Sequence, residues 1–279
     1  MKKNIMLFIG MISIIIIVIV WRQSKRYKHM EYYIQEQKYD VYFNSKEIIF
    51  NNGRQSYSII PSKNHQYIDM AMGDLHSDGQ MNLLILEGKK PPYGEELIIY
   101  DWIENANELQ IQEKYRNRID TIHPWKIETC DIDGDGELEI FIAVNKSTYY
   151  YPKKENRPFF FNFKDDILVK KWTGSRIRAP FIDVCFTDLN GNGQDDWIVI
   201  EESEKGGMVV ATYYWFGFGF ILQAESEIYE AIDSMRVKQM GENKVIELNI
   251  RENGKVHTVL LKPSCYKTKN DIYQLKEGS

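Results

Sequence analysis

Cysteine is scarce in this sequence, and the number and spacing of the cysteines exclude a fully paired disulfide framework and the common zinc and redox motifs. Only three cysteines occur among the 279 residues: Cys130, Cys185 and Cys265. An odd number cannot form a fully paired disulfide framework, and these spacings match no zinc or redox motif. We therefore expect the cysteines to be small, buried apolar residues, and we do not expect a Cys130–Cys185 bridge.

An excess of positive charge is also missing, and so is helical periodicity of useful length after residue 36. The net charge is −5, and since binding to phosphates needs a basic face, nothing favours a nucleic-acid partner. Apolar residues make up 43% of the chain and aromatic residues 13%. These values suit a full core and favour strands over helices. The composition therefore predicts a globular protein built from β-strands.

A long apolar run stands at the N-terminus. It comprises the 17 residues from Ile5 to Trp21, which as a helix would span about 25 Å, enough for a thin bilayer. No small-residue cleavage site follows it, so we expect a retained transmembrane signal anchor rather than a cleaved leader. The expected organisation is a short tail (1–4), the anchor (5–21), a juxtamembrane linker (22–37) and one domain (38–279).

Two indications of the orientation of this anchor disagree. Two lysines precede the run and four basic residues follow it, Arg22, Lys25, Arg26 and Lys28, and the positive-inside rule then favours a cytoplasmic domain. The very short N-terminal tail and the cation chemistry of the loops described below favour the outside. We expect a single-pass protein of the cell membrane with its main domain outside the cytoplasm.

One segment occurs three times in the rest of the chain. The copies are Ile68–Glu87, Trp125–Asn145 and Ile182–Glu201. In each copy a short alternating stretch precedes an acidic, glycine-containing loop, and an apolar stretch follows it. The loops begin at Asp74, Asp131 and Asp188, which are 57 residues apart at both steps. A fixed period of this length is typical of a repeat architecture.

The repeats predict the blades of a β-propeller. A fourth, degenerate copy spans Ile232–Arg251, with Lys238 in place of the first acid. Further strand-like runs between the loops give about four strands per repeat, the content of one blade. Three short runs before the first copy either complete the last blade or belong to a fifth: Tyr39–Phe43, Glu47–Phe50 and Ser56–Ile60. The expected fold is an all-β propeller of four to five blades, preceded by one transmembrane helix.

The second loop has the composition of a cation site. Acids occupy its positions 1, 3, 5 and 9, namely Asp131, Asp133, Asp135 and Glu139. Calcium takes several oxygen ligands, and alternating acids in a tight loop bring their carboxylates to one point. Glu137, at position 7, would add its backbone carbonyl. Gly134 and Gly136 permit the positive φ angles of such a turn. Without a cation the carboxylates would repel one another, so we expect this loop to be either filled or strained.

The loop differs from an EF-hand, which has a bidentate Glu at position 12, because Ile142 stands there. It resembles instead the loop of the FG-GAP/VCBS repeat, the blade type of integrin α-subunit propellers, and the resemblance extends from Ile68 onward. It implies structural calcium in the loop that joins the first two strands of a blade. The third loop would use Asp188, Asn190, Asn192 and Asp196 and bind more weakly.

In the first loop Asp74 and Asp78 match the pattern, whereas His76 and Asn82 replace acids, so metal binding there is left open. The alternative for all three loops is that they are Asp/Asn/Gly turns without metal. A second recurring acid stands near the start of the first strand, at Asp69, Asp183 and Asp233, with Lys126 in the remaining copy. We expect a repeated structural hydrogen bond there rather than a functional acid cluster.

No nucleophile elbow, phosphate-binding loop or zinc-type histidine spacing occurs, so the expected class is not an enzyme. The family resemblance implies adhesion, assembly or ligand recognition, and we predict a cell-surface binding module for a protein or glycan. The alternative is a lectin or glycan-active enzyme, for which Trp102 or Trp215 would contact sugar. A third possibility is a passive subunit of a larger envelope complex. The aromatic runs at 149–151, 159–161 and 213–220 are expected to be mainly core.

Overall fold

The computed structural model describes residues 27–34, 37–105, 108–174, 177–241, 243–263 and 273–277. These residues form strands and one short 3-10 helix, Asp120–Ile122. The expected tail and anchor, and the start of the expected linker, lie at residues 1–26, outside the described part of the chain. Within that part, no helix has the length and apolar character that crossing a membrane requires.

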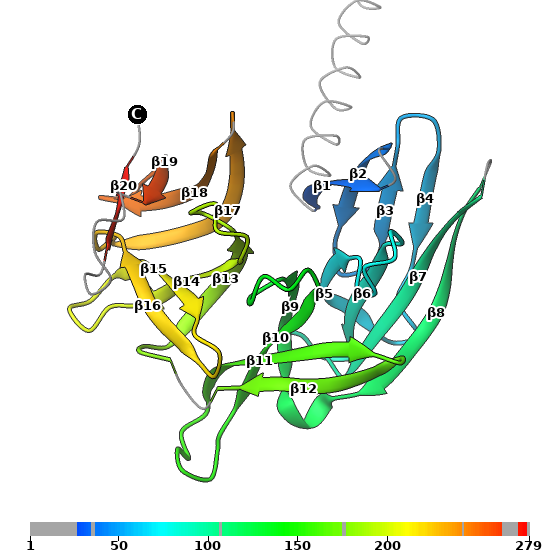
Figure 1. The fold of residues 1–279 in the computed structure, drawn as a ribbon, viewed down its shortest axis with the longest axis horizontal. Coiled ribbons are helices and arrows are strands. Elements are labelled where there is room, and N and C mark those ends of the chain that lie inside the picture. The colour runs from blue at the N-terminus through cyan, green and yellow to red at the C-terminus, as the bar shows by residue number, and fades with distance from the viewer. Residues whose placement is uncertain are drawn as a thin grey trace, which may run out of the picture. The chain divides into compact units, whose positions relative to one another are not determined.

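The protein is an all-β, five-bladed propeller of four-stranded antiparallel sheets (Figure 1). The first blade contains β1 (Lys28–Ile34), β2 (Gln37–Phe43), β3 (Ile48–Asn51) and β4 (Ser56–Ile59). The second contains β5 (Gln66–Gly73), β6 (Asn82–Gly88), β7 (Glu96–Asn105) and β8 (Glu108–Arg118). The third contains β9 (Pro124–Cys130), β10 (Glu139–Lys146), β11 (Glu155–Lys164) and β12 (Ile167–Thr173).

The fourth blade contains β13 (Phe181–Thr187), β14 (Asp196–Glu202), β15 (Met208–Trp215) and β16 (Phe220–Glu225). The fifth contains β17 (Ala231–Met240), β18 (Asn243–Glu252), β19 (Lys255–Pro263) and β20 (Tyr273–Glu277). A short parallel pairing of β16 with β20 connects these two sheets. The chain divides into two compact units, the first ending at Tyr67 and the second starting at Ile68.

The first blade settles the number of sheets, because the three runs before the first repeat form a sheet of their own. This sheet begins at Lys28, inside the segment expected to be a linker. Alternate residues of β1, Met30, Tyr32 and Ile34, are the less exposed ones, and β1 pairs along its full length with β2. The polar His29 and Glu31 stand at the exposed positions of this alternation, which the expectation of a linker over residues 22–37 overlooked.

In the second unit, the second strand of a blade is buried on both faces. On β10, Ile140 and Ile142 pack in a cluster with Leu84 of the second blade, whereas Phe141 packs in a different cluster with Trp197 of the fourth blade. Side chains of a strand alternate between its two faces. A strand covered by a sheet on each side therefore needs apolar residues at every position. This requirement explains the continuous apolar stretch that follows each loop in the sequence.

Polar contacts also join the first strands of neighbouring blades. The Asp69 carboxylate on β5 accepts the backbone N–H of Ile127 on β9 at 3.0 Å. The Lys126 ammonium on β9 pairs with Asp183 on β13 at 2.8 Å. The recurring acid near the start of the first strand thus has a structural partner in both blades, as expected. In the fifth blade Asp233 instead pairs with Arg251 of the same sheet.

The two described cysteines, Cys130 and Cys185, are both free, which confirms that they form no bridge. Cys130 is buried and Cys185 is partly exposed. Cys265 lies outside the described residues.

Replacing Lys126 by Met should destabilise the fold. Burial alone would lower the pKa of this amine, but the carboxylates of Glu128, Asp69 and Asp183 raise it above its ordinary value. Without the ammonium these acids lose their compensating charge. Removing one partner of a fully buried pair costs about 3–5 kcal/mol, and we expect a smaller loss here because Glu128 and Asp183 are partly exposed. The measurement is the urea unfolding midpoint. Lys164→Met, which breaks the exposed pair with Glu137, is the control and should change stability by less than about 1 kcal/mol. Equal midpoints for the two variants would contradict the proposed role of Lys126.

Candidate metal centre

Three loops join the first and second strands of consecutive blades and share one hydrogen-bond design. They are loop 1 (residues 74–82), loop 2 (131–139) and loop 3 (188–196). In each, the acid at position 1 accepts the backbone N–H of the glycine at position 6. The distances are 2.8 Å for Gly79 to Asp74, 2.9 Å for Gly136 to Asp131 and 2.9 Å for Gly193 to Asp188. All three glycines have positive φ angles, which a glycine adopts at no steric cost.

The residue at position 9 closes each loop from the inside. Its side-chain oxygen accepts a hydrogen bond from the backbone N–H of position 2. Leu75 donates to Asn82 at 3.0 Å, Ile132 donates to Glu139 at 3.0 Å and Leu189 donates to Asp196 at 3.1 Å. All three position-9 side chains are buried. Loops 2 and 3 therefore each place a carboxylate in the protein interior. Burial raises the pKa of Glu139, and it raises the pKa of Asp196 to about 7.

Loop 2 brings three of its predicted ligands together. One carboxylate oxygen each from Asp131, Asp133 and Glu139 lie within 4.8 Å of one another. The other two predicted residues do not join this group. Asp135 accepts the N–H of Glu137 at 2.8 Å, and the Glu137 carboxylate pairs with Lys164 at 2.8 Å. The sequence assigned only the backbone carbonyl of Glu137 to a cation.

The donor set of loop 2 fits a hard cation such as calcium. Every ligand atom is a carboxylate oxygen, the type that calcium prefers. Asp133 Oδ1 is buried and has no hydrogen-bond partner among the described residues, and an orphaned buried acceptor requires an explanation. One positive group already contacts the cluster. The Lys171 ammonium on β12 lies 2.5 Å from Asp133 Oδ2 and 2.6 Å from Glu139 Oε1. Sequence reasoning missed this lysine.

Loops 1 and 3 gather fewer negative charges. In loop 3 the Asp188 carboxylate accepts backbone N–H groups from Asn190, Gly191 and Asn192, and the Asn190 amide oxygen accepts from Asn192. In loop 1 the carboxylates of Asp74 and Asp78 accept N–H groups of the turn in the same way. The His76 ring lies 5.5 Å from the Phe163 ring, and the Asn82 amide donates to Asp101.

The three loops contact one another in sequence. Asp131 and Asp195 exchange two hydrogen bonds, from the Asp131 N–H to the Asp195 carboxylate at 3.0 Å and from the Asp195 N–H to the Asp131 carbonyl at 2.7 Å. Ser77 of loop 1 donates to the Gly136 carbonyl at 2.8 Å. A Cβ on Gly134 would lie 2.9 Å from Gln194 Cγ, so loop 3 packs directly on loop 2. Loop 2 thus connects the second, third and fourth blades.

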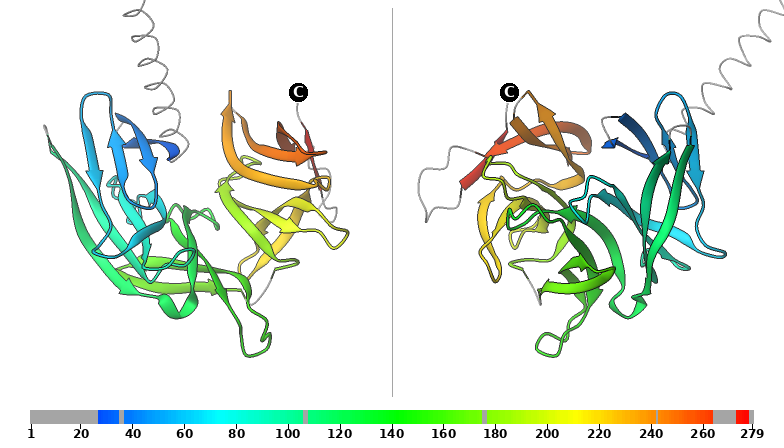
Figure 2. Two further views of the ribbon diagram at one scale, coloured as in Figure 1. Left: turned by 180° about the vertical axis from the view of Figure 1, so that it is seen from behind. Right: turned by 45° about the vertical axis from the view of Figure 1, so that its right-hand side comes forward.

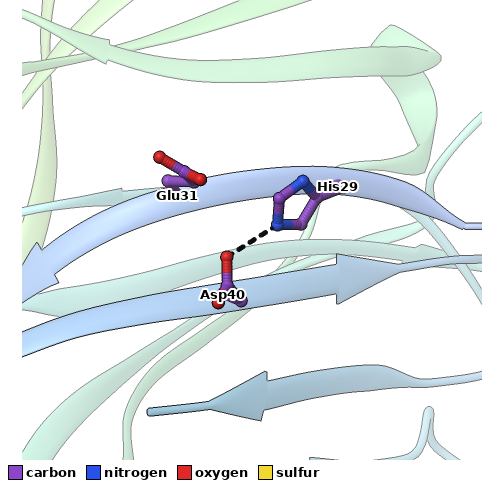
Figure 3. A group of neighbouring side chains, drawn as sticks. All are labelled: His29, Glu31 and Asp40. Carbon is purple, nitrogen blue, oxygen red and sulfur yellow. Dashed lines mark hydrogen bonds and ion pairs between the residues drawn. The ribbon is translucent and has the colours of Figure 1, made fainter. Parts of the chain in front are cut away.

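A second group of ligand-type side chains lies on the first blade: His29, Glu31 and Asp40 (Figure 3). His29 Nε2 is 2.9 Å from Asp40 on the neighbouring strand, and Lys38 pairs with Glu31 at 2.7 Å. The side chains are 38–49% exposed, and the Lys38 ammonium already compensates the acids. This group forms a surface ion network. The sequence could not predict it, because the strand β1 was not predicted.

The fold and its loops define the class of protein as a five-bladed, all-β propeller with an acidic loop cluster on one unit. No protein-family model matches the chain, and no curated protein matches it either.

The raised pKa of Asp196 predicts a dependence of stability on pH. An unfolded Asp titrates near pH 4, whereas burial raises the folded-state pKa of Asp196 to about 7. Between these values the folded state holds the extra proton, so the stability of the metal-free protein should fall as the pH rises from about 4 to 7. Asp196→Asn cannot titrate, yet it keeps an acceptor for the Leu189 N–H, as Asn82 does in loop 1.

The measurement is urea unfolding of the metal-free protein at pH 5 and pH 8. The fall in the free energy of unfolding should be smaller in Asp196→Asn than in the wild type, by at most about 3 kcal/mol, because about two pKa units separate pH 5 from the folded-state value. Glu202→Gln, at an exposed acid of the same blade, is the control and should behave as the wild type. An unchanged pH dependence in Asp196→Asn would contradict the assignment.

Proposed function

We propose that the protein is a calcium-stabilised, membrane-anchored propeller that binds another macromolecule at the cell surface. Calcium binding is supported by the convergence of carboxylate oxygens from Asp131, Asp133 and Glu139. It is also supported by the buried Asp133 Oδ1, which has no hydrogen-bond partner among the described residues. The anchor part rests on the apolar run at 5–21, and the location outside the cytoplasm rests on the calcium chemistry.

The contacts of loop 2 support a structural role for the ion. Asp131 is bonded to loop 3 through Asp195, and Gly136 is bonded to loop 1 through Ser77. A cation that fixes the carboxylates of Asp131 and Asp133 would therefore also stiffen the junction of three blades. Binding to the folded state alone stabilises a protein by mass action.

The binding part of the proposal rests on the loop between β10 and β11, which extends beyond its sheet (Figure 2). Tyr149 and Tyr150 at its tip are 93% and 91% exposed, although large aromatic side chains gain most when buried. Thr148 and Tyr151 close the turn with two backbone hydrogen bonds. The loop is therefore a well-defined turn that presents two aromatic rings to solvent.

A buried arginine holds this loop in place. Arg157 is fully buried, and its guanidinium donates to the carbonyls of Lys146, Tyr151 and Lys153. Burying a charged group is costly unless its hydrogen bonds are satisfied, and these carbonyls satisfy several of them. Because a pre-ordered loop loses less entropy on binding, this arrangement suits a recognition surface for a protein or glycan.

The two residues that the sequence suggested as sugar contacts, for the alternative function as a lectin or glycan-active enzyme, are not accessible to a ligand. Trp102 and Trp215 are buried, at 2% and 9% exposure, so their indole rings are part of the core. The expectation that aromatic runs are mainly core holds for Phe160 and Tyr213 but not for the tips of the two hairpins, where Tyr149, Tyr150, Phe216 and Phe218 are exposed.

Calcium should raise the thermal stability of the full-length protein, and Asp133→Ala should abolish most of this increase. Asp133 is the ligand of choice for the test because its carboxylate accepts none of the turn hydrogen bonds reported for Asp131. At 100 times the dissociation constant, one site stabilises by about 2.7 kcal/mol. The measurement is thermal unfolding in a calcium series against EGTA.

The matched control is Glu137→Gln, which changes an acid of the same loop whose side chain faces Lys164. It should retain the calcium response of the wild type. A melting temperature of the wild type that does not respond to calcium would refute the structural calcium site.

Photo-crosslinking tests the recognition loop. A benzophenone amino acid replacing Tyr150 should form a discrete adduct in intact cells, because this side chain faces solvent at a fixed position. The same substitution at Ile167, which is also exposed but lies on a strand of the same blade, is the control and should form none. Identical patterns at both positions, or no adduct at Tyr150, would argue against the loop as the contact surface.

A further inference from the structure

The fourth strand of three consecutive blades carries a bulge at one equivalent place. In the second blade the pairing of β7 with β8 passes from Tyr115 to Glu113 and leaves Lys114 unpaired. In the third, the pairing of β11 with β12 passes from Trp172 to Lys170 and leaves Lys171 unpaired. In the fourth, Gln223 is the unpaired residue. A bulge re-aims the side chain of its extra residue.

In the third blade the bulge directs Lys171 into loop 2. Its ammonium lies 2.5 Å from Asp133 Oδ2 and 2.6 Å from Glu139 Oε1, and its side chain is 15% exposed. Glu139 is fully buried. The ammonium therefore occupies the place between two carboxylates where a bridging cation would contact the same oxygens.

The neighbouring blades show the same design with less charge. Lys114 lies 57 residues before Lys171 and approaches loop 1 through Asp101, at 3.8 Å. Asp101 in turn accepts the amide of Asn82, the position-9 residue of loop 1. In the fourth blade the neutral Gln223 stands at the bulge. The most acidic of the three loops is thus the one with a lysine in direct contact.

We propose that Lys171 is an internal cation that competes with calcium for loop 2. The proposal rests on the calcium site proposed above and concerns its regulation. With calcium absent, the ammonium neutralises Asp133 and Glu139. With calcium bound, the ammonium leaves these oxygens, because two positive charges at contact distance repel each other strongly in a partly buried site.

This exchange changes the expected behaviour of the metal-free loop. The sequence predicted that loop 2 would be strained without a cation, but Lys171 compensates the two acids, so the loop keeps its fold. Calcium must displace an ion pair before it binds, and its affinity is reduced accordingly. The four-carbon stem of a lysine is flexible enough to let the ammonium move out to water while the stem stays on the protein.

The test compares calcium binding to the full-length wild type and to Lys171→Gln by isothermal titration with calcium chloride. Glutamine is the residue that the fourth blade already has at this bulge. We expect Lys171→Gln to bind calcium about tenfold more tightly or better, and to melt at a lower temperature than the wild type in EGTA. Lys164→Gln is the matched control, since it removes the same charge from the exposed partner of Glu137. It should bind calcium like the wild type.

The outcomes separate the two proposals. Equal affinity of the wild type and Lys171→Gln would overturn the competition and leave the calcium site standing. An equal gain in affinity for Lys164→Gln would also overturn it, because the effect would then be one of overall charge. Absence of calcium binding to either protein would overturn both proposals. Binding to Lys171→Gln alone would show that Lys171 excludes calcium from loop 2, and it would overturn the proposal that the wild type is stabilised by calcium.

A measurement on the wild type decides the matter if Lys171→Gln does not fold. Acylation of lysines, quantified residue by residue by mass spectrometry, should become faster at Lys171 as calcium is added, because the ammonium is released from its two carboxylates. Lys170, which faces solvent on the same strand, provides the internal reference. A reactivity of Lys171 that does not change at saturating calcium would overturn the proposal.

Discussion

The buried carboxylate of Glu139 is the group on which the loop cluster depends. It is fully buried, it fixes the start of loop 2 through the N–H of Ile132, and Asn162 donates to its other oxygen. A buried negative charge needs a positive partner. The structure provides one in Lys171, and the proposed calcium ion would be another. The stability of the loop and its proposed regulation both follow from this requirement.

The same loop, closed by a buried side chain at position 9, occurs in three blades. Each loop is closed by hydrogen bonds to its own position-1 and position-9 side chains, so the turn itself does not require a metal. What differs is the charge at position 9, which is Asn82 in loop 1, Glu139 in loop 2 and Asp196 in loop 3. The mutual contacts of the loops, through Asp195 and Ser77, connect the blades at the place where these charges gather. A cation bound in loop 2, as proposed, would therefore act at the junction of three blades.

The sequence predicted the features that depend on regular spacing. The 57-residue interval located the three loops, and the apolar stretches after them predicted the second strands, such as β10. It did not predict β1, although Met30, Tyr32 and Ile34 alternate there with His29 and Glu31. It also missed Lys171, since a bulge arises from the pairing of β11 with β12 and not from local sequence. The sequence did contain one indication of this lysine, because Lys114 and Lys171 are 57 residues apart, the same interval that separates the loops. The support of the Tyr149–Tyr150 turn by Arg157 likewise depends on contacts that spacing does not reveal.

The most direct test of the central claim is an anomalous-scattering map from crystals of the protein soaked in calcium. The account predicts a peak at coordination distance from carboxylate oxygens of Asp131, Asp133 and Glu139, with the Lys171 ammonium turned away from them. A map without a peak in loop 2, with Lys171 still in contact with Asp133 and Glu139, would contradict it. Loop 2 would then be a turn neutralised by lysine alone.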